Sequence, residues 1–220
     1  MGRLLIAGAV LALGQAAPAF AGDGFCRNGI FTEQNPAFGL ARISGQGKAR
    51  FYDDMNGCPS VGPSCQQKTY VVPGDRVVTG RSLGQFVCVY FPNGVGGTAG
   101  WMPRSRLTAL PVNPRPPLTA WLGRWADNDN WVRFSRAGSG LKAEGMAYWP
   151  GANPSPEDRP GGPNTGEIAG LLRLSGNRAV EPECQVTFHL LNDILIAVDP
   201  VRRCDGMNVT FSGVYQRVKR

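Results

Sequence analysis

Three carboxylates lie close to tryptophans in the second half of the chain, and their types could support acid–base chemistry. Asp127 and Asp129 fall between Trp125 and Trp131, and Glu144 follows on a later β-prone run. Two carboxylates flanking a sugar are the usual pair in glycoside hydrolysis, so these residues define a glycosidase-like candidate. The run Asp-Asn-Asp-Asn is equally ordinary turn chemistry. Because a turn explains the residues without any reaction, we favour a protein that is not an enzyme.

Other catalytic patterns are absent from the sequence. His189 is the only histidine, and it alternates with Val186, Phe188 and Leu190, so we expect it on the solvent side of a strand. The chain has no phosphate-binding glycine loop and no Ser-His-Asp order. It has no Cys-x-x-Cys pair, so zinc is not expected. We expect neither a metal nor another cofactor.

The first 21 residues have the three parts of a secretory signal peptide. Met1-Gly2-Arg3 is positive, the run 4–13 is apolar, and Ala19 and Ala21 supply small residues for cleavage. The uncharged run 4–22 could also be a membrane anchor by its length, but Gly, Gln and Pro interrupt it. We therefore expect residues 1–21 to be removed and the protein to be periplasmic or secreted.

Four prolines between Leu110 and Leu118 divide the rest of the chain. Proline lacks an N–H and has a restricted φ, so this run cannot belong to a central strand or to a helix interior. It favours an extended, semi-rigid polyproline II spacer. The sequence predicts an N-terminal domain at 22–110, a linker at 111–118 and a C-terminal domain at 119–220.

The six cysteines are expected to form disulfides, because an even number in an exported chain is typical of a disulfide framework. Two follow the linker and should pair with each other. Of the four before it, two bracket a short loop rich in Pro, Gly and Ser and should pair, which leaves one more pair. The expected bridges are Cys184–Cys204, Cys58–Cys65 and Cys26–Cys88.

The N-terminal domain is expected to be a small barrel of short strands. Residues 22–40 show little periodicity and should form an extended arm pinned by Cys26. The run 86–91 alternates two apolar sets, as a strand covered on both faces would. The β-prone runs are 49–52, 68–72, 76–79, 86–91, 98–103 and 107–110.

Four motifs of this domain resemble the bacterial SH3-like domains of exported proteins. They are Ala49-Arg50-Phe51-Tyr52, Tyr70-Val71-Val72-Pro73-Gly74-Asp75, Phe86-Val87-Cys88-Val89 and Gly100-Trp101-Met102-Pro103. The resemblance covers about residues 43–110 and implies a barrel that binds peptidoglycan or a protein partner beside another domain. The chain departs from the family by an insert at 56–67, in a place suited to a ligand-facing loop.

Four aromatic residues of this domain are candidates for a ligand-binding surface: Tyr52, Tyr70, Tyr90 and Trp101. An apolar ring with a polar tip suits a groove that is open to water. The core is the other interpretation, and in so small a barrel we favour it for Trp101. Tyr52, beside Asp53 and Asp54, is the better exposed candidate.

The C-terminal domain is expected to be an antiparallel barrel or sandwich, which makes the whole chain all-β. Asn192-Asp193 predicts a hairpin turn, and residues 150–164 predict a long surface loop that is either disordered or functional. The β-prone runs are 119–125, 131–134, 141–147, 171–174, 179–180, 185–191, 194–198 and 208–215.

This domain resembles a C-terminal β domain of uncharacterised exported bacterial proteins, which implies no function. The residues that carry the resemblance are Trp121, Gly123, Trp125, Gly166, Glu167, Cys184, Asp199, 204–209, Phe211, Gly213 and Tyr215.

The net charge of the chain is +7, with basic residues crowded at 202–203 and 217–220. This crowding is typical of a solvated face, and it would also favour a weak contact with an anionic surface. An exported chain without a dense basic stripe is not expected to bind nucleic acid. The sequence therefore predicts an exported, non-enzymatic binding protein whose SH3-like domain recognises cell-wall peptide or an envelope protein.

Overall fold

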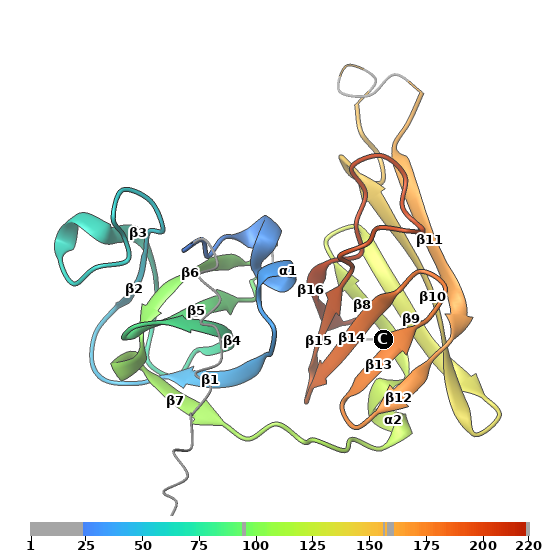
Figure 1. Cartoon of the computed structure of the whole chain (residues 1–220), viewed down its shortest axis with the longest axis horizontal. Coiled ribbons are helices and arrows are strands. Elements are labelled where there is room, and N and C mark those ends of the chain that lie inside the picture. Colours follow the sequence, from blue (N-terminus) through green and yellow to red (C-terminus); the bar gives the residue numbers. More distant parts are fainter. Residues whose placement is uncertain (1–23, 94–95, 156, 158–160, 219–220) are drawn as a thin grey trace, which may run out of the picture.

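Two antiparallel β sheets make up the fold in the computed structural model, which describes residues 24–93, 96–155, 157 and 161–218. Figure 1 shows the sheets side by side, the first in blue to green and the second in yellow to red. The all-β class expected from the sequence is confirmed. The expected signal peptide at 1–21 lies outside the described residues. No helix within them has the length and apolar character needed to cross a bilayer.

Seven strands of the described chain form the first sheet, in the order β3-β2-β6-β5-β4-β1-β7. Their bounds are β1 Gly39–Ile43, β2 Ala49–Tyr52, β3 Gln66–Val71, β4 Arg76–Leu83, β5 Phe86–Phe91, β6 Thr98–Pro103 and β7 Leu107–Leu110. The short helix α1, Phe31–Gln34, precedes them. Short 3₁₀ turns lie at Asn28–Ile30, Pro63–Cys65 and Arg104–Arg106.

Nine strands of the described chain form the second sheet, in the order β11-β10-β9-β8-β16-β15-β14-β13-β12. The edge strands β11 and β12 are joined through Leu172 alone, so the sheet curves back on itself into a nearly closed barrel. The helix α2 is Leu118–Trp121. The strands are β8 Gly123–Asp127, β9 Asn130–Ala137, β10 Gly140–Trp149, β11 Asn164–Leu171, β12 Arg173–Ser175, β13 Arg178–Glu181, β14 Val186–Leu191, β15 Ile194–Val198 and β16 Gly213–Arg217.

Three local expectations from the sequence are corrected. The expected arm at 22–40 ends earlier, because residues 39 and 40 belong to the strand β1. The run 119–125 is split between α2 and β8, and the strand begins at Gly123, whose φ of +108° is one that glycine adopts readily. The run 208–215 joins the sheet only from Gly213, since the backbone N–H of Phe211 donates to the Asp199 carboxylate rather than to a neighbouring strand.

Each sheet encloses an apolar core of its own, as alternation of apolar residues along the strands predicts. The largest fully buried side chains of the first core are Ile43, Phe51 and Met102, and those of the second are Trp121, Trp125, Phe134, Leu141, Phe188, Phe211 and Tyr215.

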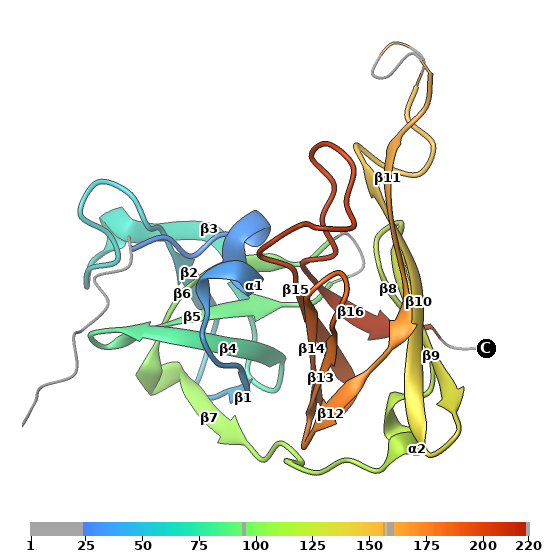
Figure 2. The same ribbon diagram turned by 45° about the vertical axis from the view of Figure 1, so that its right-hand side comes forward.

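A third apolar cluster lies between the two sheets and joins them. β15 shows why: Leu195 and Ala197 belong to the core of the second sheet, whereas Ile194 and Ile196 pack toward the first domain. α1 contacts β15 and β16, and Figure 2 shows it between the sheets. The two halves therefore form one packed unit. The cluster contains Cys26, Phe31, Leu40, Val78, Phe86, Cys88, Tyr90, Ala99 and Trp101 of the first domain and Leu191, Ile194, Ile196 and Val214 of the second.

The hairpin turn at Asn192-Asp193, expected from the sequence, fastens the proline-rich segment and the first domain at once. The side-chain amide of Asn192 donates to the Pro111 carbonyl at 3.0 Å, and its oxygen accepts the Asn113 N–H at 3.0 Å. Asp193 forms a bidentate ion pair with Arg76, with N–O distances of 2.9 and 2.7 Å. The segment thus lies against the second sheet rather than acting as a free spacer.

All six cysteines of the chain lie within the described residues and form the three expected disulfides. Disulfides persist in oxidising compartments and are rare in the cytosol. The three bridges therefore indicate a non-cytosolic, oxidising location.

The shared cluster predicts how stability is coupled across the molecule. We expect Ile196→Ala to lower the free energy of unfolding by about 2–5 kcal/mol, because it leaves a cavity between the sheets. Hydrogen exchange should show faster amide exchange in β5 of the first domain as well as in β15.

The matched control is Leu195→Ala, which removes a side chain of the same kind from the core of the second sheet. It should cost a similar free energy while leaving amide exchange in β5 less affected. Equal loss of β5 protection in the two variants would contradict the coupling.

Candidate functional site

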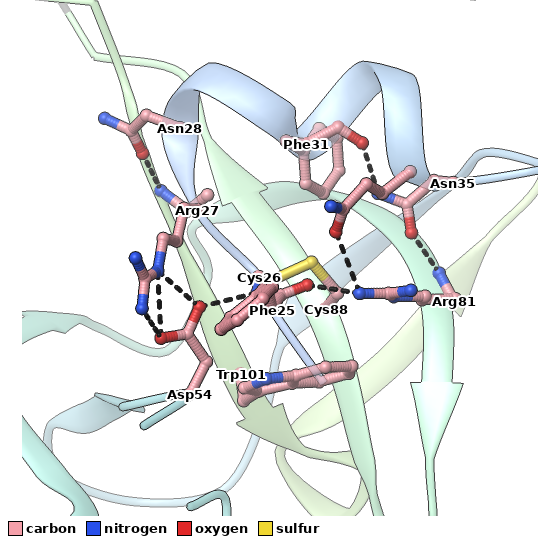
Figure 3. The surroundings of a disulfide bond; sticks show 12 residues. Phe25, Cys26, Arg27, Asn28, Phe31, Asn35, Asp54, Arg81, Cys88 and Trp101 are labelled. Carbon is pink, nitrogen blue, oxygen red and sulfur yellow. Dashed lines mark hydrogen bonds and ion pairs between the residues drawn. A yellow bond between two sulfur atoms is a disulfide. The ribbon is translucent and has the colours of Figure 1, made fainter. Parts of the chain in front are cut away.

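The N-terminal arm covers the face of the first sheet that carries Trp101 and Tyr90. The Cys26–Cys88 disulfide pins the arm to β5, and the indole N–H of Trp101 donates to the Gly24 carbonyl at 2.9 Å. Figure 3 shows the arm running over the Trp101 ring beside this disulfide. The side chain of Tyr90 is buried, and its hydroxyl donates to the Gly96 carbonyl at 2.7 Å.

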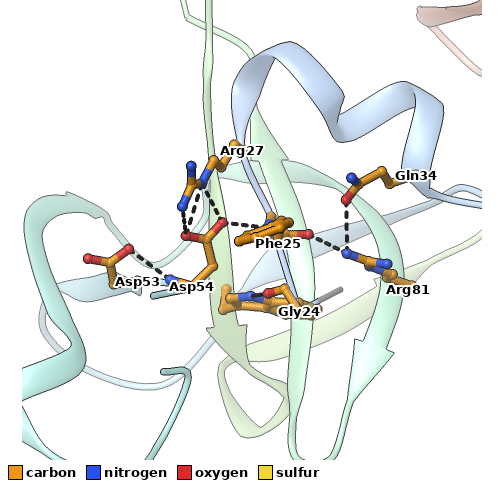
Figure 4. Close-up of polar contacts among 9 residues, drawn as sticks. Gly24, Phe25, Arg27, Gln34, Asp53, Asp54 and Arg81 are labelled. Carbon is orange, nitrogen blue, oxygen red and sulfur yellow. Dashed lines mark hydrogen bonds and ion pairs between the residues drawn. The ribbon is translucent and has the colours of Figure 1, made fainter. Parts of the chain in front are cut away.

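Polar contacts lock the arm in this position. Asp54, whose side chain is buried, accepts the Cys26 N–H at 2.9 Å and pairs with the Arg27 guanidinium at 2.8 Å. Burial opposes ionisation of this carboxyl, but the hydrogen bonds from Arg27 and Cys26 together lower the pKa of Asp54. On the other side, Arg81 donates to the Phe25 carbonyl and to Gln34 (Figure 4).

This arrangement corrects the expectation that four aromatic residues form one ligand surface. Trp101 is 1% exposed and Tyr90 is 5% exposed, so neither can contact a ligand while the arm is in place. Tyr52 and Tyr70 stay accessible. Trp101 is in the core, which was the interpretation that its size favoured.

Tyr52 lines an open groove of about 260 Å³ on the first domain, which we call the tyrosine groove. The Tyr52 ring packs 5.0 Å from that of Phe86, and its hydroxyl accepts a hydrogen bond from Gln66 at 3.1 Å. Tyr70 is 44% exposed and faces Arg50 across the β2–β3 pair, so it borders the groove. The lining residues are Lys48, Ala49, Arg50, Tyr52, Gln66, Met102, Pro103, Ser105 and Arg106.

Three cations surround the tyrosine groove, and none of its described lining residues is acidic. Arg50 donates to the carbonyls of Gln67 and Lys68, and Arg106 donates to those of Ser44, Gly47 and Lys48. The ammonium group of Lys48 lies 4.1 Å from the centre of the Tyr70 ring, in a cation–π contact.

These contacts hold the positive charges in place while leaving them unneutralised. A short acidic ligand would therefore meet a fixed cationic rim and an aromatic wall.

The sequence identified Tyr52 and Tyr70 but missed the three cations around them. Arg50 follows Ala49 in a recognised strand, so alternation alone would have placed it on the same face as Tyr52. Arg106 lies far from both in the chain, and only the closure of the sheet brings it to the groove.

Asp127 and Asp129 line the same polar pocket of about 300 Å³, where the second domain faces Asn28, Gly29 and Gly96 of the first. Burial raises the pKa of Asp127 to about 6, although the carboxylate accepts the Val214 N–H at 3.2 Å. Asp129 accepts the Ala152 N–H at 2.9 Å. Both carboxylates thus hold backbone segments together.

The run Asp-Asn-Asp-Asn spans the hairpin between β8 and β9, in which Asp127 pairs with Asn130. Asn128 and Asp129 form the two-residue turn, and Asn128 has a φ of +52°. Turn chemistry therefore accounts for it, as the sequence favoured. Glu144 lies elsewhere, on β10 opposite Arg133, where it is accessible and pairs with Lys142 at 2.6 Å. That ion pair lowers the pKa of Glu144. The three carboxylates do not form one acid–base set.

His189 lies on the outer face of β14, as alternation predicted, but it is half-buried there. The ring packs edge-on against Phe38 of the first domain, with centroids 5.3 Å apart. Burial lowers the pKa of His189, and the nearby Arg178 adds to the effect. The expectation of a solvent-side histidine holds in part, because Phe38 of the first domain covers one side of the ring and leaves the rest accessible.

A carboxyl pair, Asp199 and Asp205, holds the 199–211 segment; the sequence placed both residues in a family resemblance but assigned them no role. Asp199, 1% exposed, accepts the backbone N–H groups of Arg202 and Phe211 at 3.0 and 3.1 Å. Both carboxylate oxygens of Asp205 are buried and receive no hydrogen bond from the described residues. Burial, and then the neighbouring Asp199, raise the pKa of Asp205 to about 8. Protonated Asp205 can donate a hydrogen bond to Asp199, which agrees with the direction of this shift.

The Asp205 carboxyl should make stability depend on pH. A carboxyl with a raised pKa in the folded state contributes stability that is full below its ordinary pKa and lost as pH rises through about 8. We expect Asp205→Asn, which mimics the protonated form, to gain at least about 1 kcal/mol over the native protein between pH 5 and pH 8.

Urea unfolding across this pH range measures the difference between the two proteins. The matched control is Asp193→Asn, because the Arg76 ion pair lowers the pKa of Asp193 and its effect should stay constant over the same range. A difference in unfolding free energy between the Asp205→Asn variant and the native protein that does not change with pH would rule out a raised pKa of Asp205.

No group of three or more metal-ligating side chains lies together among the described residues. Comparisons of this chain with family models, with curated proteins and with solved structures find no match.

Proposed function

We propose that this protein is an exported, non-enzymatic binding protein whose N-terminal domain is an SH3-like module that recognises an acidic cell-wall peptide. The tyrosine groove is the binding site in this proposal, with Tyr52 and Tyr70 as the aromatic contacts. An acidic peptide of an envelope protein would use the same contacts.

The observation that carries the proposal is the composition of the tyrosine groove. Lys48, Arg50 and Arg106 present positive charge around Tyr52, and no described lining residue is acidic. Arginine and lysine bind peptide carboxylates through charge-assisted hydrogen bonds, and an accessible tyrosine ring supplies apolar contact. Because the arginines are already fixed by backbone carbonyls, little side-chain entropy is lost when a ligand binds.

The position of β3 also supports a peptide as the ligand. β3 is an edge of the first sheet, it is mostly exposed, and it contributes Gln66 to the groove and Tyr70 to its border. An edge strand offers unpaired backbone N–H and C=O groups that can pair with an extended peptide.

Export rests on two supports of different kinds. The three disulfides agree with folding outside the cytosol, and the first 21 residues have the pattern of a secretory signal. In this proposal the mature protein begins near Gly22 and acts in the periplasm or outside the cell.

A wall-active hydrolase is the second candidate, and one observation favours it. Asp127 and Asp129 line one pocket, and the raised pKa of Asp127, about 6, is suited to a general acid. Glu144 takes no part in that pocket, since it is paired with Lys142 on β10. Both aspartates accept backbone N–H groups, however, which favours a structural role.

Retention on cell-wall sacculi tests the binding proposal. We expect Tyr52→Ala to weaken retention about tenfold, the loss typical of an aromatic contact at the centre of a binding site. The matched control is Trp149→Ala, which removes an exposed aromatic residue of the second domain and should leave retention unchanged. Melting curves confirm that both variants fold. Native retention of the Tyr52→Ala variant would exclude the tyrosine groove.

Peptidoglycan zymography tests the second candidate. Because the three carboxylates serve structural contacts, we expect the native protein to produce no clearing. Clearing that disappears in Asp127→Asn but persists in Glu144→Gln would replace the binding proposal with a hydrolase centred on the Asp127 pocket.

A further inference from the structure

A second basic surface, separate from the tyrosine groove, lies on the second domain. It is an open groove of about 1020 Å³ where β8 and β9 meet the end of β16, and we call it the arginine groove. Its described lining residues include four arginines and no carboxylate: Arg124, Arg133, Arg136 and Arg217.

Two arginines of the groove oppose each other in the sheet without a compensating carboxylate between them. Arg124 and Arg133 lie directly opposite each other on β8 and β9, and like charges in that position are destabilising. Glu144 neighbours Arg133 on the other side and attracts it electrostatically, but its carboxylate is paired with the Lys142 ammonium at 2.6 Å. Within the described chain, Arg133 and Arg136 make no ion pair or hydrogen bond. An anion between the strands would relieve this repulsion.

Two of the arginines are held in place by aromatic rings. The Arg124 guanidinium lies 4.3 Å from the Trp131 ring centre, and that of Arg217 lies 4.1 Å from the Trp125 ring centre. Arg217 also donates to the Leu122 and Ala120 carbonyls. Stacking orients the Arg124 guanidinium while its edge remains able to bind an oxyanion in the bidentate manner. Both terminal nitrogens of Arg217 already donate to carbonyls, so Arg217 contributes mainly fixed positive charge. The groove is therefore organised before any ligand arrives.

We propose that the arginine groove binds a linear anionic polysaccharide through its carboxylate groups. Arg133 and Arg136 are three residues apart on β9 and project from opposite faces of the strand. The four arginines are therefore distributed around the groove, as a chain of anions requires, rather than gathered on one small ion. The groove is concave, and a flat bilayer surface would not reach its floor as a polymer chain does. The three disulfides indicate a location outside the cytosol, where polysaccharides rather than nucleic acids are the common polyanions.

Binding of polygalacturonate, a linear polymer of uronic acid, tests this site directly. We compare the native protein with Arg133→Gln/Arg136→Gln, which removes two exposed arginines that make no ring contact. We expect affinity to fall at least about tenfold, because two charge-assisted contacts are lost. Because a like-charge pair is relieved, the melting temperature should stay level or rise.

The matched control is Arg42→Gln/Arg173→Gln, which removes the same charge from exposed positions outside the groove. It should bind polygalacturonate as the native protein does. Equal weakening in the two double variants would show that binding follows net charge and would overturn the site. Native affinity in Arg133→Gln/Arg136→Gln would overturn it as well.

Three further probes test the commitment to an acidic polysaccharide. Dextran, which is neutral, should not bind. The loss of binding caused by Arg133→Gln/Arg136→Gln should be smaller for poly-L-glutamate and for vesicles containing phosphatidylglycerol than for polygalacturonate at equal ionic strength. A larger loss for either one would assign the groove to an acidic peptide or to a lipid surface and would overturn the polysaccharide assignment. Since Tyr52→Ala leaves the arginine groove intact, its binding to polygalacturonate should remain native even if the tyrosine groove proves inactive.

Discussion

Burial of an apolar layer between the two sheets is the interaction on which the rest of this structure depends. β15 is apolar on both faces, and only one face can point into the second barrel. Its other face, with Ile194 and Ile196, would be exposed to water without the first domain. At about 25 cal/mol per Å² of apolar area, covering such side chains stabilises the docked arrangement substantially. The proline-rich segment joins two bodies that are already held together.

The Cys26–Cys88 disulfide makes this layer possible on the side of the first domain. It holds the N-terminal arm against β5, so that Phe31 of α1 can pack with Tyr90, 5.4 Å away between ring centres. The same arm covers Trp101. A face that an isolated barrel could offer to a ligand is therefore used to attach the second domain, and recognition is left to surfaces at the periphery, where the tyrosine groove and the arginine groove lie.

Partly or fully buried carboxylates accept hydrogen bonds from backbone N–H groups in several places. Asp54 accepts the Cys26 N–H, Asp127 accepts the Val214 N–H, and Asp199 accepts the Phe211 N–H. In each case a carboxylate from one segment satisfies a donor that no strand pairs, which a loop-rich β protein must do because a buried unpaired N–H is costly. Such roles produce shifted pKa values without catalysis, so the pKa of Asp127 is weak support for an enzyme taken alone.

The sequence by itself determined the local structure and the covalent framework. Short β-prone runs bounded by turn residues located β2, β5, β6 and β7 at their bounds, because strand propensity and turn chemistry are local properties of the chain. The spacing of the cysteines around the proline run was enough to pair all six.

Only the tertiary structure decided which outer faces meet water. Ile196 points out of the second barrel, yet it is buried by the first domain, and His189 on the same outer side is half-buried against Phe38. Likewise, Arg106 lines the same groove as Tyr52, and Arg217 lines the same groove as Arg133, although the members of each pair are far apart in the sequence. Periodicity records only that a side chain points away from its own core. What lies beyond that face depends on contacts between residues far apart in sequence, and those contacts form only when the two sheets close and dock.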